Sequence, residues 1–286
     1  MNASRRRLRV LVTGGGSGIG AAVVNVAAAQ GHFAFAGGRR FASLEKARGD
    51  NGVSIWNVPL NVRDEVTCRA AVEEMKKEVS GIDVLVANAG VPYSGAFEET
   101  PIHEFKRVLD VNFLGAARMI QSVLPVMREA RRGVIIVVSS LSGLIGLPGD
   151  SAYAASKFAL EGACEALAPE VARFGVKVLI VEPGAVKTEF MADAAQASGE
   201  AVPEYDPFRA FLAERAQGRS RGADAADIAE EIVAMMENPE GPLRRPVGDQ
   251  ARRVAERLQT LSEKERAALA LDASGLDWWA AGRASS

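Results

Sequence analysis

Short apolar runs alternate with longer helix-like segments through the first two thirds of the chain. The runs occupy residues 8–13, 32–36, 53–58, 83–87, 134–139 and 176–181. Several are apolar throughout, as in parallel strands that are covered on both faces. The segments between them have the length and spacing of helices, at 19–30, 64–79, 101–130 and 152–174. The pattern predicts βαβ units, and therefore an α/β fold with a doubly wound parallel sheet of about seven strands between two layers of helices.

The alternation stops after residue 188. Residues 189–221 are polar and Ala-rich, and they predict a helical lid or irregular insertion without strands. The remaining elements are expected to be a helix, a short strand and a second helix, at 224–236, 243–247 and 250–271. Residues 250–286 then form a C-terminal helical extension. Because no repeat, linker or low-complexity tract divides the chain, we expect one domain over residues 1–286.

The composition is that of an ordinary globular protein, with 48% hydrophobic and 24% charged residues. A net charge of -2 gives no electrostatic basis for binding nucleic acid. The two cysteines, Cys68 and Cys164, are too few for a metal knuckle or a disulfide framework and are typical of a reducing compartment. No apolar run approaches the ~20 residues of a membrane helix. We therefore expect a cytoplasmic protein with no metal site and no membrane association.

A glycine-rich turn joins the first apolar run to the first helical segment. In a strand–turn–helix of this kind, backbone N–H groups and the helix N-terminus receive a pyrophosphate. Glycine is needed there because side chains would block the approach of the ligand to the backbone. The spacing is G-x-x-x-G-x-G, and its place after the first strand of a βαβ series indicates a Rossmann-type nucleotide site. The residues expected to line that site are Gly14, Gly16, Ser17, Gly18, Ile19 and Gly20.

Two arginines, Arg39 and Arg40, follow the second apolar run. At this distance from the glycine turn, an NAD site carries an acid that holds the ribose 2′-hydroxyl, and the first acid here is Glu45. An acid would repel a 2′-phosphate, whereas guanidinium groups pair with one. The two arginines therefore favour NADP(H) over NAD(H).

Tyr153 and Lys157 are four residues apart near the start of a helix-like segment, so they share one helix face. A phenol has a pKa near 10, and a neighbouring cation lowers that pKa by favouring the phenolate. Such a pair is suited to protonating a carbonyl oxygen as hydride arrives, or to deprotonating an alcohol in the reverse direction. An isolated pair of this kind is common on helix surfaces, so the prediction depends on the motifs around it.

With these motifs in this order, residues 8–190 resemble the short-chain dehydrogenase/reductase family. Besides the glycine turn and the Tyr/Lys pair, the resemblance covers a helix asparagine and a serine at the end of the fifth run, Asn112 and Ser140. It also covers two further segments that in the family contact the cofactor, Asn88-Ala89-Gly90 and 183–188.

The resemblance implies a role for each matching residue. Tyr153 would be the general acid for reduction and the general base for oxidation. Lys157 would lower the pKa of Tyr153 and hold the nicotinamide ribose, while Ser140 would hydrogen-bond the substrate oxygen. Asn112 would hold a water of a proton relay to Lys157 or support the backbone. The glycine turn, the two arginines Arg39 and Arg40, and the pair Tyr153 and Lys157 would all contact the cofactor. The resemblance implies further cofactor contacts at Asn61, Val62, Asn88, Ala89, Gly90, Pro183, Gly184, Val186 and Thr188.

The chain departs from the family at Asn61, where an aspartate usually lies near the adenine. An asparagine keeps a carbonyl acceptor and adds a donor, so we expect adenine binding to persist. Ser139 is a weaker candidate than Ser140, because neighbouring residues of a strand face opposite sides.

Two segments should set substrate specificity, 141–152 and the lid 189–221. Their apolar residues are Leu141, Leu144, Ile145, Leu147, Phe190, Met191, Tyr205, Phe208, Phe211 and Leu212. Ser140, Leu141, Leu147, Tyr153 and Phe190 are the expected substrate contacts. An apolar lid favours a small hydrophobic ketone or alcohol, and the layout is loosely similar to the hydroxysteroid-dehydrogenase-like branch of the family.

The sequence thus predicts an NADPH-dependent carbonyl reductase that also oxidises alcohols. Two alternatives stay open: an NADP(H)-sensing regulator without turnover, and an NAD-dependent alcohol dehydrogenase. The resemblance also implies a homodimer or homotetramer, with the helices at 101–130 and 152–174 as interface elements. Trp278 and Trp279 near the C-terminus either pack against a neighbouring element or contact a second subunit.

Overall fold

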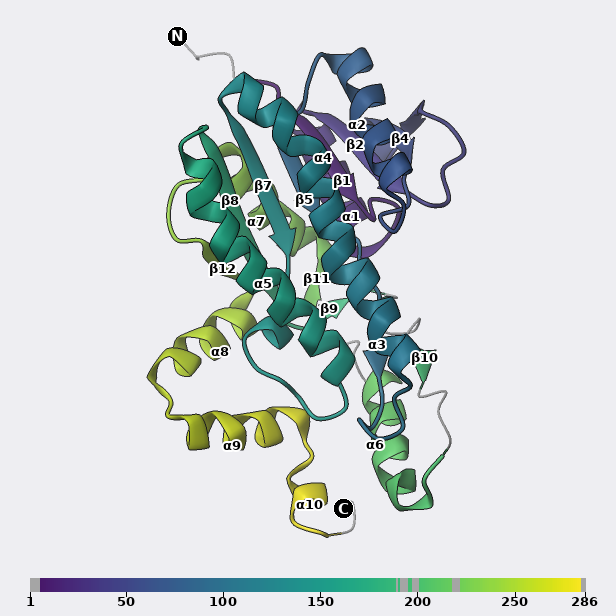
Figure 1. The fold of residues 1–286 in the computed structure, drawn as a ribbon, viewed down its shortest axis with the longest axis vertical. Coiled ribbons are helices and arrows are strands. Elements are labelled where there is room, and N and C mark those ends of the chain that lie inside the picture. The colour runs from purple at the N-terminus through teal and green to yellow at the C-terminus, as the bar shows by residue number, and fades with distance from the viewer. Residues whose placement is uncertain (1–5, 189, 191–194, 197–200, 218–221, 284–286) are drawn as a thin grey trace.

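The computed structural model describes residues 6–188, 190, 195–196, 201–217 and 222–283. In this part of the chain, one eight-stranded sheet has the order β12-β8-β7-β5-β1-β2-β4-β3 (Figure 1). Its strands are β1 (Arg9–Thr13), β2 (Phe33–Gly38), β3 (Glu45–Arg48), β4 (Ser54–Pro59), β5 (Val84–Ala87), β7 (Gly133–Val138), β8 (Val176–Pro183) and β12 (Arg244–Val247). All neighbours pair in parallel except β3, which is antiparallel to β4. The predicted doubly wound sheet is confirmed.

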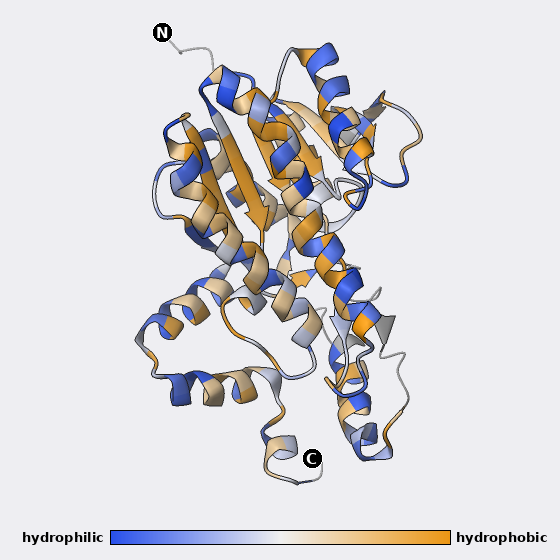
Figure 2. Ribbon diagram, in the orientation of Figure 1, coloured by the Kyte–Doolittle hydropathy of each residue, from blue (hydrophilic) through white to orange (hydrophobic). Residues whose placement is uncertain are grey.

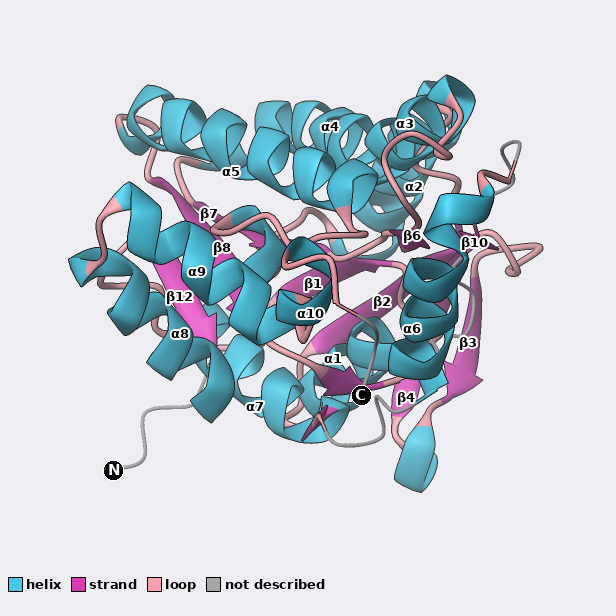
Figure 3. Cartoon of the chain, turned by 90° about the horizontal axis from the view of Figure 1, so that it is seen from below, coloured by secondary structure: helices cyan, strands magenta, loops and turns pink. Residues whose placement is uncertain are grey.

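Helices cover both faces of the sheet, and this explains why its central strands are apolar throughout. The helices are α1 (Gly18–Ala29), α2 (Glu65–Val79), α4 (Gly115–Ala130), α5 (Ser151–Ala172) and α7 (Ala225–Glu237). On one face α2, α4 and α5 pack against residues such as Leu85 and Ile135, and on the other α1 and α7 pack against Val86 and Ile136. Figure 3 shows these two layers, and Figure 2 shows the apolar strands between them.

The antiparallel strand β3 was missing from the prediction. Its residues Glu45-Lys46-Ala47-Arg48 are mostly exposed and charged, as suits a sheet edge, and they carry no alternation that would predict a strand.

The segment 101–130, predicted as one helix, is divided. It consists of α3 (Ile102–Leu109), a π-helical turn (Asp110–Leu114) and α4. Arg118 donates to the Asp110 carbonyl oxygen and carboxylate, and so satisfies groups at the start of the widened turn. Single π-helical turns often mark functional sites, and Asn112 lies in this one.

The C-terminal extension also differs from the prediction of one helix over 250–271. It contains α8 (Asp249–Thr260), α9 (Glu263–Ser274) and the short α10 (Asp277–Ala280). The chain breaks because Ser262 and Glu265 form a capping box that starts α9: each side chain bonds to the other residue's backbone N–H. The Ser-x-x-Glu spacing was visible in the sequence.

Part of the predicted lid is described, and it contains the expected helix, α6 (Asp206–Gln217). It also contains a short strand, β10 (Ala195–Gln196), which pairs with β6 (Tyr93–Ser94), so the expectation of a lid without strands is wrong. Residues 189, 191–194, 197–200 and 218–221 of the predicted lid, Met191 among them, lie outside the described residues. Figure 1 shows α6, α9 and α10 beyond the carboxyl ends of the strands.

Both C-terminal tryptophans pack against α6 within the same chain. The ring centroid of Trp279 lies 5.4 Å from that of Phe208, and that of Trp278 lies 5.9 Å from that of Phe211. Two ion pairs, Arg209 with Glu99 and Arg215 with Asp150, also tie α6 to the rest of the domain. The C-terminal tail and α6 therefore form one packed unit.

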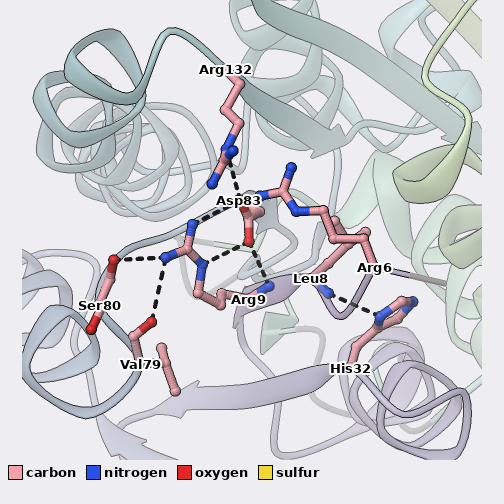
Figure 4. Close-up of polar contacts among 8 residues, drawn as sticks. All are labelled: Arg6, Leu8, Arg9, His32, Val79, Ser80, Asp83 and Arg132. Carbon is pink, nitrogen blue, oxygen red and sulfur yellow. Dashed lines mark hydrogen bonds and ion pairs between the residues drawn. The ribbon is translucent and has the colours of Figure 1, made fainter. Parts of the chain in front are cut away.

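At the opposite end of the sheet, Asp83 holds the first strand in place (Figure 4). Its carboxylate accepts hydrogen bonds from Arg6 and from both the side chain and the backbone N–H of Arg9, and it lies 3.5 Å from the Arg132 guanidinium. Burial alone would raise the pKa of Asp83, but the hydrogen bonds from Arg9 and its charge outweigh burial and lower that pKa. The basic N-terminal run is thus partly used to secure the sheet.

Among the described residues, no helix is long and apolar enough to cross a bilayer.

Candidate active site

The glycine turn has a backbone that only glycine adopts easily. Gly14 and Gly18 have φ values of +66° and +53°. A side chain at Gly20 would collide with the Gly14 carbonyl oxygen and the Asn88 side chain. Ser17 precedes α1, and its side chain does not cap the helix, so that first-turn N–H groups remain for an anion. The turn therefore has the shape and polarity of a pyrophosphate site.

Asn88 and Ala89 brace this turn from the neighbouring strand. The Thr13 hydroxyl accepts hydrogen bonds from both of their backbone N–H groups, at 3.0 and 2.9 Å. The Asn88 side chain donates to the Thr13 carbonyl oxygen at 3.0 Å. The Asn88 side chain thus supports the glycine turn itself. Thr13, at the end of β1, was not singled out from the sequence.

Arg40 lies against the glycine turn, where its Nη2 donates to the Gly16 carbonyl oxygen at 2.9 Å. A Cβ at Gly16 would lie 3.3 Å from the same nitrogen, so glycine is what permits this approach. Arg39 is its exposed neighbour on the same rim. The structure brings at least one of the two predicted arginines to the edge of the nucleotide site.

Asn61 and Val62 follow β4. Asn61 Oδ1 accepts from the Arg63 backbone N–H at 3.2 Å, which fixes the amide. The Val62 side chain is buried in the core, and a Cβ at Gly115 would lie 2.7 Å from it. A cofactor contact by Val62 would therefore have to come from its backbone, and both assignments stay predictions.

The segment after β8 crosses to the glycine turn. A Cβ at Gly18 would lie 3.3 Å from Thr188 Cγ2, so the turn and Thr188 are immediate neighbours. The Gln250 side chain accepts from the Ala185 N–H at 3.0 Å and packs against Gly184, which secures the segment from α8. Val186 belongs to the short strand β9 (Val186–Lys187), paired with β11 (Ala223–Asp224). Thr188 thus lies beside the glycine turn, and the cofactor contacts of this segment stay predictions.

Tyr153 and Lys157 lie together in the first turns of α5. Lys157 Nζ is 5.5 Å from the Tyr153 ring centroid and donates to the Val138 carbonyl oxygen at 2.8 Å, at the end of β7. Lys157 is 4% exposed, and burial lowers its pKa to about 8 against an opposing effect of Glu161. A cation beside the phenol favours phenolate, so the pair can move a proton near neutral pH.

The two serines after β7 face different ways. Ser140 Oγ accepts from the Ser142 N–H at 3.1 Å and caps the 3₁₀ turn Leu141–Gly143, which packs against α5. One acceptor position is thereby used, and the O–H proton can be donated outward. Ser139 instead donates to Glu161 Oε1 at 2.6 Å in the interior. The expectation that Ser139 points away from Ser140 is confirmed.

Asn112 connects the π-helical turn to Tyr153. Its amide oxygen accepts from the Val91 N–H at 2.8 Å, and its amide nitrogen donates to the Val91 carbonyl oxygen and to Ser156 Oγ. Ser156 in turn donates to the Tyr153 carbonyl oxygen at 2.6 Å. The Asn112 side chain is therefore used to support the backbone, one of the two roles expected for it. Ser156, which sequence reasoning missed, lies within the Tyr-x-x-Ser-Lys segment itself.

The predicted substrate contacts separate into two groups. The rings of Phe190 and Tyr153 are 6.0 Å apart edge to face, so Phe190 faces the catalytic phenol. Leu147 belongs instead to an apolar cluster with Leu258 and Leu269 of the C-terminal extension. This packing favours a structural role for Leu147.

No group of three or more metal-binding side chains occurs among the described residues.

Comparison with known proteins identifies the family. A model of the short chain dehydrogenase family matches residues 9–199. The chain is 33% identical over 241 residues to 3-ketodihydrosphingosine reductase of Bacteroides thetaiotaomicron, covering 84% of this chain and 87% of that protein. It is 36% identical over 197 residues to 17-beta-hydroxysteroid dehydrogenase type 1 of Homo sapiens, covering 67% and 60%. A solved short-chain dehydrogenase from Streptomyces avermitilis has a TM-score of 0.76 at 30% identity, covering 98% of both chains.

Proposed function

The chain belongs to the short-chain dehydrogenase/reductase family, oxidoreductases that act on alcohol and carbonyl groups, and we propose that it reduces the carbonyl of a small hydrophobic substrate with NADPH. One observation carries this proposal: Lys157 lies beside Tyr153 and donates to the carbonyl oxygen of the last residue of β7. Ser140 follows that residue by two positions in the chain. A nucleotide-binding regulator has no need of a buried lysine held against a phenol at that position.

The roles of the residues follow from their contacts. Bound NADPH supplies the hydride. Tyr153 donates its phenolic proton to the substrate oxygen, and Lys157 stabilises the resulting phenolate by charge. Ser140 donates its O–H to the same oxygen, since the Ser142 N–H uses one acceptor position of the hydroxyl and leaves its proton available. Asn112 keeps Tyr153 in place through Ser156. In alcohol oxidation the Tyr153 phenolate accepts the proton of the substrate hydroxyl.

The preference for NADPH is proposed from Arg39 and Arg40. The glycine turn fits a dinucleotide, since Gly14 and Gly18 hold its positive-φ backbone and the Ser17 side chain does not cap the first-turn N–H groups of α1, and Arg40 lies at its edge. Arg40 lies against the glycine turn, both arginines are exposed, and no acid adjoins them in the sequence, which favours recognition of a ribose 2′-phosphate.

Replacing Arg39 and Arg40 with alanine tests this preference. The double variant should bind NADPH at least about 100-fold more weakly, since each charge-assisted contact contributes about 1.5–3 kcal/mol, while NADH affinity changes by less than about threefold. Arg48→Ala, an exposed arginine on β3, serves as the matched control. Equal losses for both cofactors would remove the case for 2′-phosphate recognition and favour the NAD-dependent alternative.

A hydrophobic substrate is proposed from the side chains near Tyr153. Phe190 presents its ring to the phenol, and α6 carries the apolar residues Phe208, Phe211 and Leu212 over the same end of the sheet. The names of two relatives above refer to a ketodihydrosphingosine and to a hydroxysteroid. Turnover of charged, small sugars in preference to apolar ketones would contradict this assignment.

A homo-oligomer is proposed from an apolar face on α4 and α5. Phe158 is 47% exposed and Leu114 is 41% exposed on this side of the domain. Between the two helices runs a shallow groove lined by residues such as Leu124 and Leu167. Exposed apolar surface of this kind on helices is typical of a subunit interface. Measuring the mass in solution by light scattering distinguishes a dimer or tetramer from a monomer.

A further inference from the structure

Behind the catalytic residues lies a buried cluster of charged side chains that the proposed chemistry does not use. Glu161 on α5 and Glu182 on β8 are each 1% exposed. Arg244 on β12 contacts both: its Nε lies 2.9 Å from Glu161 and 3.4 Å from Glu182. Burying two acids that share one arginine lowers the stability of the folded protein, which favours a functional role for the cluster.

Glu161 reaches under the turn that carries Ser140. It accepts the hydrogen bond from Ser139 Oγ at 2.6 Å, and Ser139 immediately precedes Ser140. The Gly143 backbone packs directly over the same carboxylate oxygen, and a side chain there would collide with it. The Glu161 carboxylate thus packs directly beneath the 3₁₀ turn Leu141–Gly143.

Glu161 is also the acid nearest to Lys157 along α5, one helical turn away. Burial lowers the pKa of Lys157 to about 8, and the negative charge of Glu161 opposes this fall. A buried lysine without such a charge releases its proton more readily, and an uncharged amine cannot stabilise phenolate. The charge on Glu161 therefore bears on whether Lys157 can do its work.

The other groups that face Glu161 do not replace it. Burial, with the nearby charge of Glu161, raises the pKa of Glu182 to about 8, so Glu182 is mainly neutral at pH 7. Burial likewise raises the pKa of the Cys164 thiol to about 12. Arg244 is positive and is also bound by the half-exposed Glu165, one turn further along α5. Glu161 is thus the buried negative charge on the side of Lys157.

We propose that Glu161 is a positioning residue of the reductase site, which keeps Lys157 in its ammonium form and holds the Ser140 turn through Ser139. This inference rests on the proposed function for its meaning in catalysis. It does not depend on the identity of the substrate, because Lys157 is also the proposed contact to the nicotinamide ribose.

The test compares Glu161→Gln with Glu165→Gln. Glutamine keeps the size of the side chain and an oxygen that accepts from Ser139, and it removes the charge together with the oxygen that accepts from Arg244 Nε. Glu165→Gln removes a charge from the same arginine on the same helix without touching Ser139 or Gly143. Two pH profiles are recorded: kcat for ketone reduction, and NADPH affinity followed by tryptophan fluorescence.

Both kcat and NADPH affinity are expected to fall at alkaline pH, and these falls are the alkaline limbs of the two profiles. In Glu161→Gln each limb should shift to a pH lower by about one unit, while kcat at pH 6 stays within about threefold of the unmodified protein. Glu165→Gln should overlay the unmodified protein. An unshifted limb in Glu161→Gln, or an equal loss of kcat at every pH, would overturn the proposal. If Glu161→Gln does not fold, Glu161→Asp decides instead: the retained charge should leave the limb within half a pH unit, and a full-unit shift would contradict the account.

A failure of the proposed function gives a different result. In that case the unmodified protein reduces no ketone, yet its NADPH affinity still has an alkaline limb. The comparison of Glu161→Gln with Glu165→Gln on that limb then still decides the role of Glu161.

Discussion

Replacing Glu182 with glutamine should make the protein more resistant to unfolding at alkaline pH. Both carboxyl oxygens of Glu182 are buried and lack a hydrogen-bond partner among the described residues, and the nearest cation, Arg244, is shared with Glu161 and Glu165. Burial, followed by the charge of Glu161, raises the pKa of Glu182 from 4.5 to about 8. Ionising this group in the folded protein is therefore unfavourable.

The sign and size of the effect follow from proton linkage. Below pH 4.5 the folded and unfolded chains both keep the proton, and Glu182 costs nothing. As the pH rises from 4.5 to about 8, the unfolded chain releases its proton and the folded chain does not, so stability falls by about 1.4 kcal/mol per pH unit. The loss is complete above pH 8 and is on the order of 5 kcal/mol. A glutamine is neutral throughout and removes this slope.

Urea unfolding followed by tryptophan fluorescence at pH 5.5, 7.0 and 8.5 measures the effect. The difference in unfolding free energy between Glu182→Gln and the unmodified protein should grow in favour of the variant by roughly 3 kcal/mol across this range. Glu165→Gln, whose carboxylate is half-exposed, should show no such growth. If the variant and the unmodified protein lose stability in parallel, Glu182 is ionised in the folded state and the reasoning is refuted.

Three further changes test other parts of the structure. Trp279→Ala removes ring contacts with Tyr205 and Phe208 and thereby loosens α6. KM should rise several-fold with little change in kcat, because the Tyr153 region stays intact; an unchanged KM would show that α6 does not contribute to substrate binding. Phe158→Glu places a charge on the exposed apolar face and should lower the mass measured by light scattering to that of a monomer; an unchanged mass would exclude this face as the interface. Asp83→Asn should lower the unfolding free energy at pH 7 by about 3 kcal/mol in urea titrations. Because the pKa of Asp83 is lowered in the folded state, that deficit should shrink as the pH falls below 3.8, and a constant deficit would refute the ion-pair account.

The strands and long helices followed from the sequence because their cause is local. The run 134–139 is apolar at every position except the last, and a strand covered on both faces uses such a run at that length. The elements that were missed have other causes. The edge strand β3 is held by pairing with β4, and the π-helical turn at Asp110 is held by Arg118. Neither leaves a periodic pattern, whereas the capping box at Ser262 left a readable signal that was overlooked.

The site shows the same division. Tyr153, Lys157 and Ser140 come from short motifs whose order along the chain identifies them. The residues that support them come from distant segments: Glu161 meets Ser139 and Arg244 only after β7, β12 and α5 have packed together. Leu147 has the apolar character of a substrate contact, but the C-terminal helices cover it, and composition alone cannot distinguish the two environments.

The most direct test of the central claim compares the unmodified protein with Tyr153→Phe. NADPH binding is titrated by fluorescence, and NADPH consumption is then followed on a panel of hydrophobic ketones. We predict that both proteins bind NADPH with affinities within about threefold, that the unmodified protein reduces at least one ketone, and that Tyr153→Phe loses at least about 100-fold in kcat, the general acid's contribution. Comparable turnover by Tyr153→Phe would contradict the assignment of the proton donor. Tight NADPH binding without turnover across the panel would contradict the reductase itself and favour a nucleotide-sensing protein.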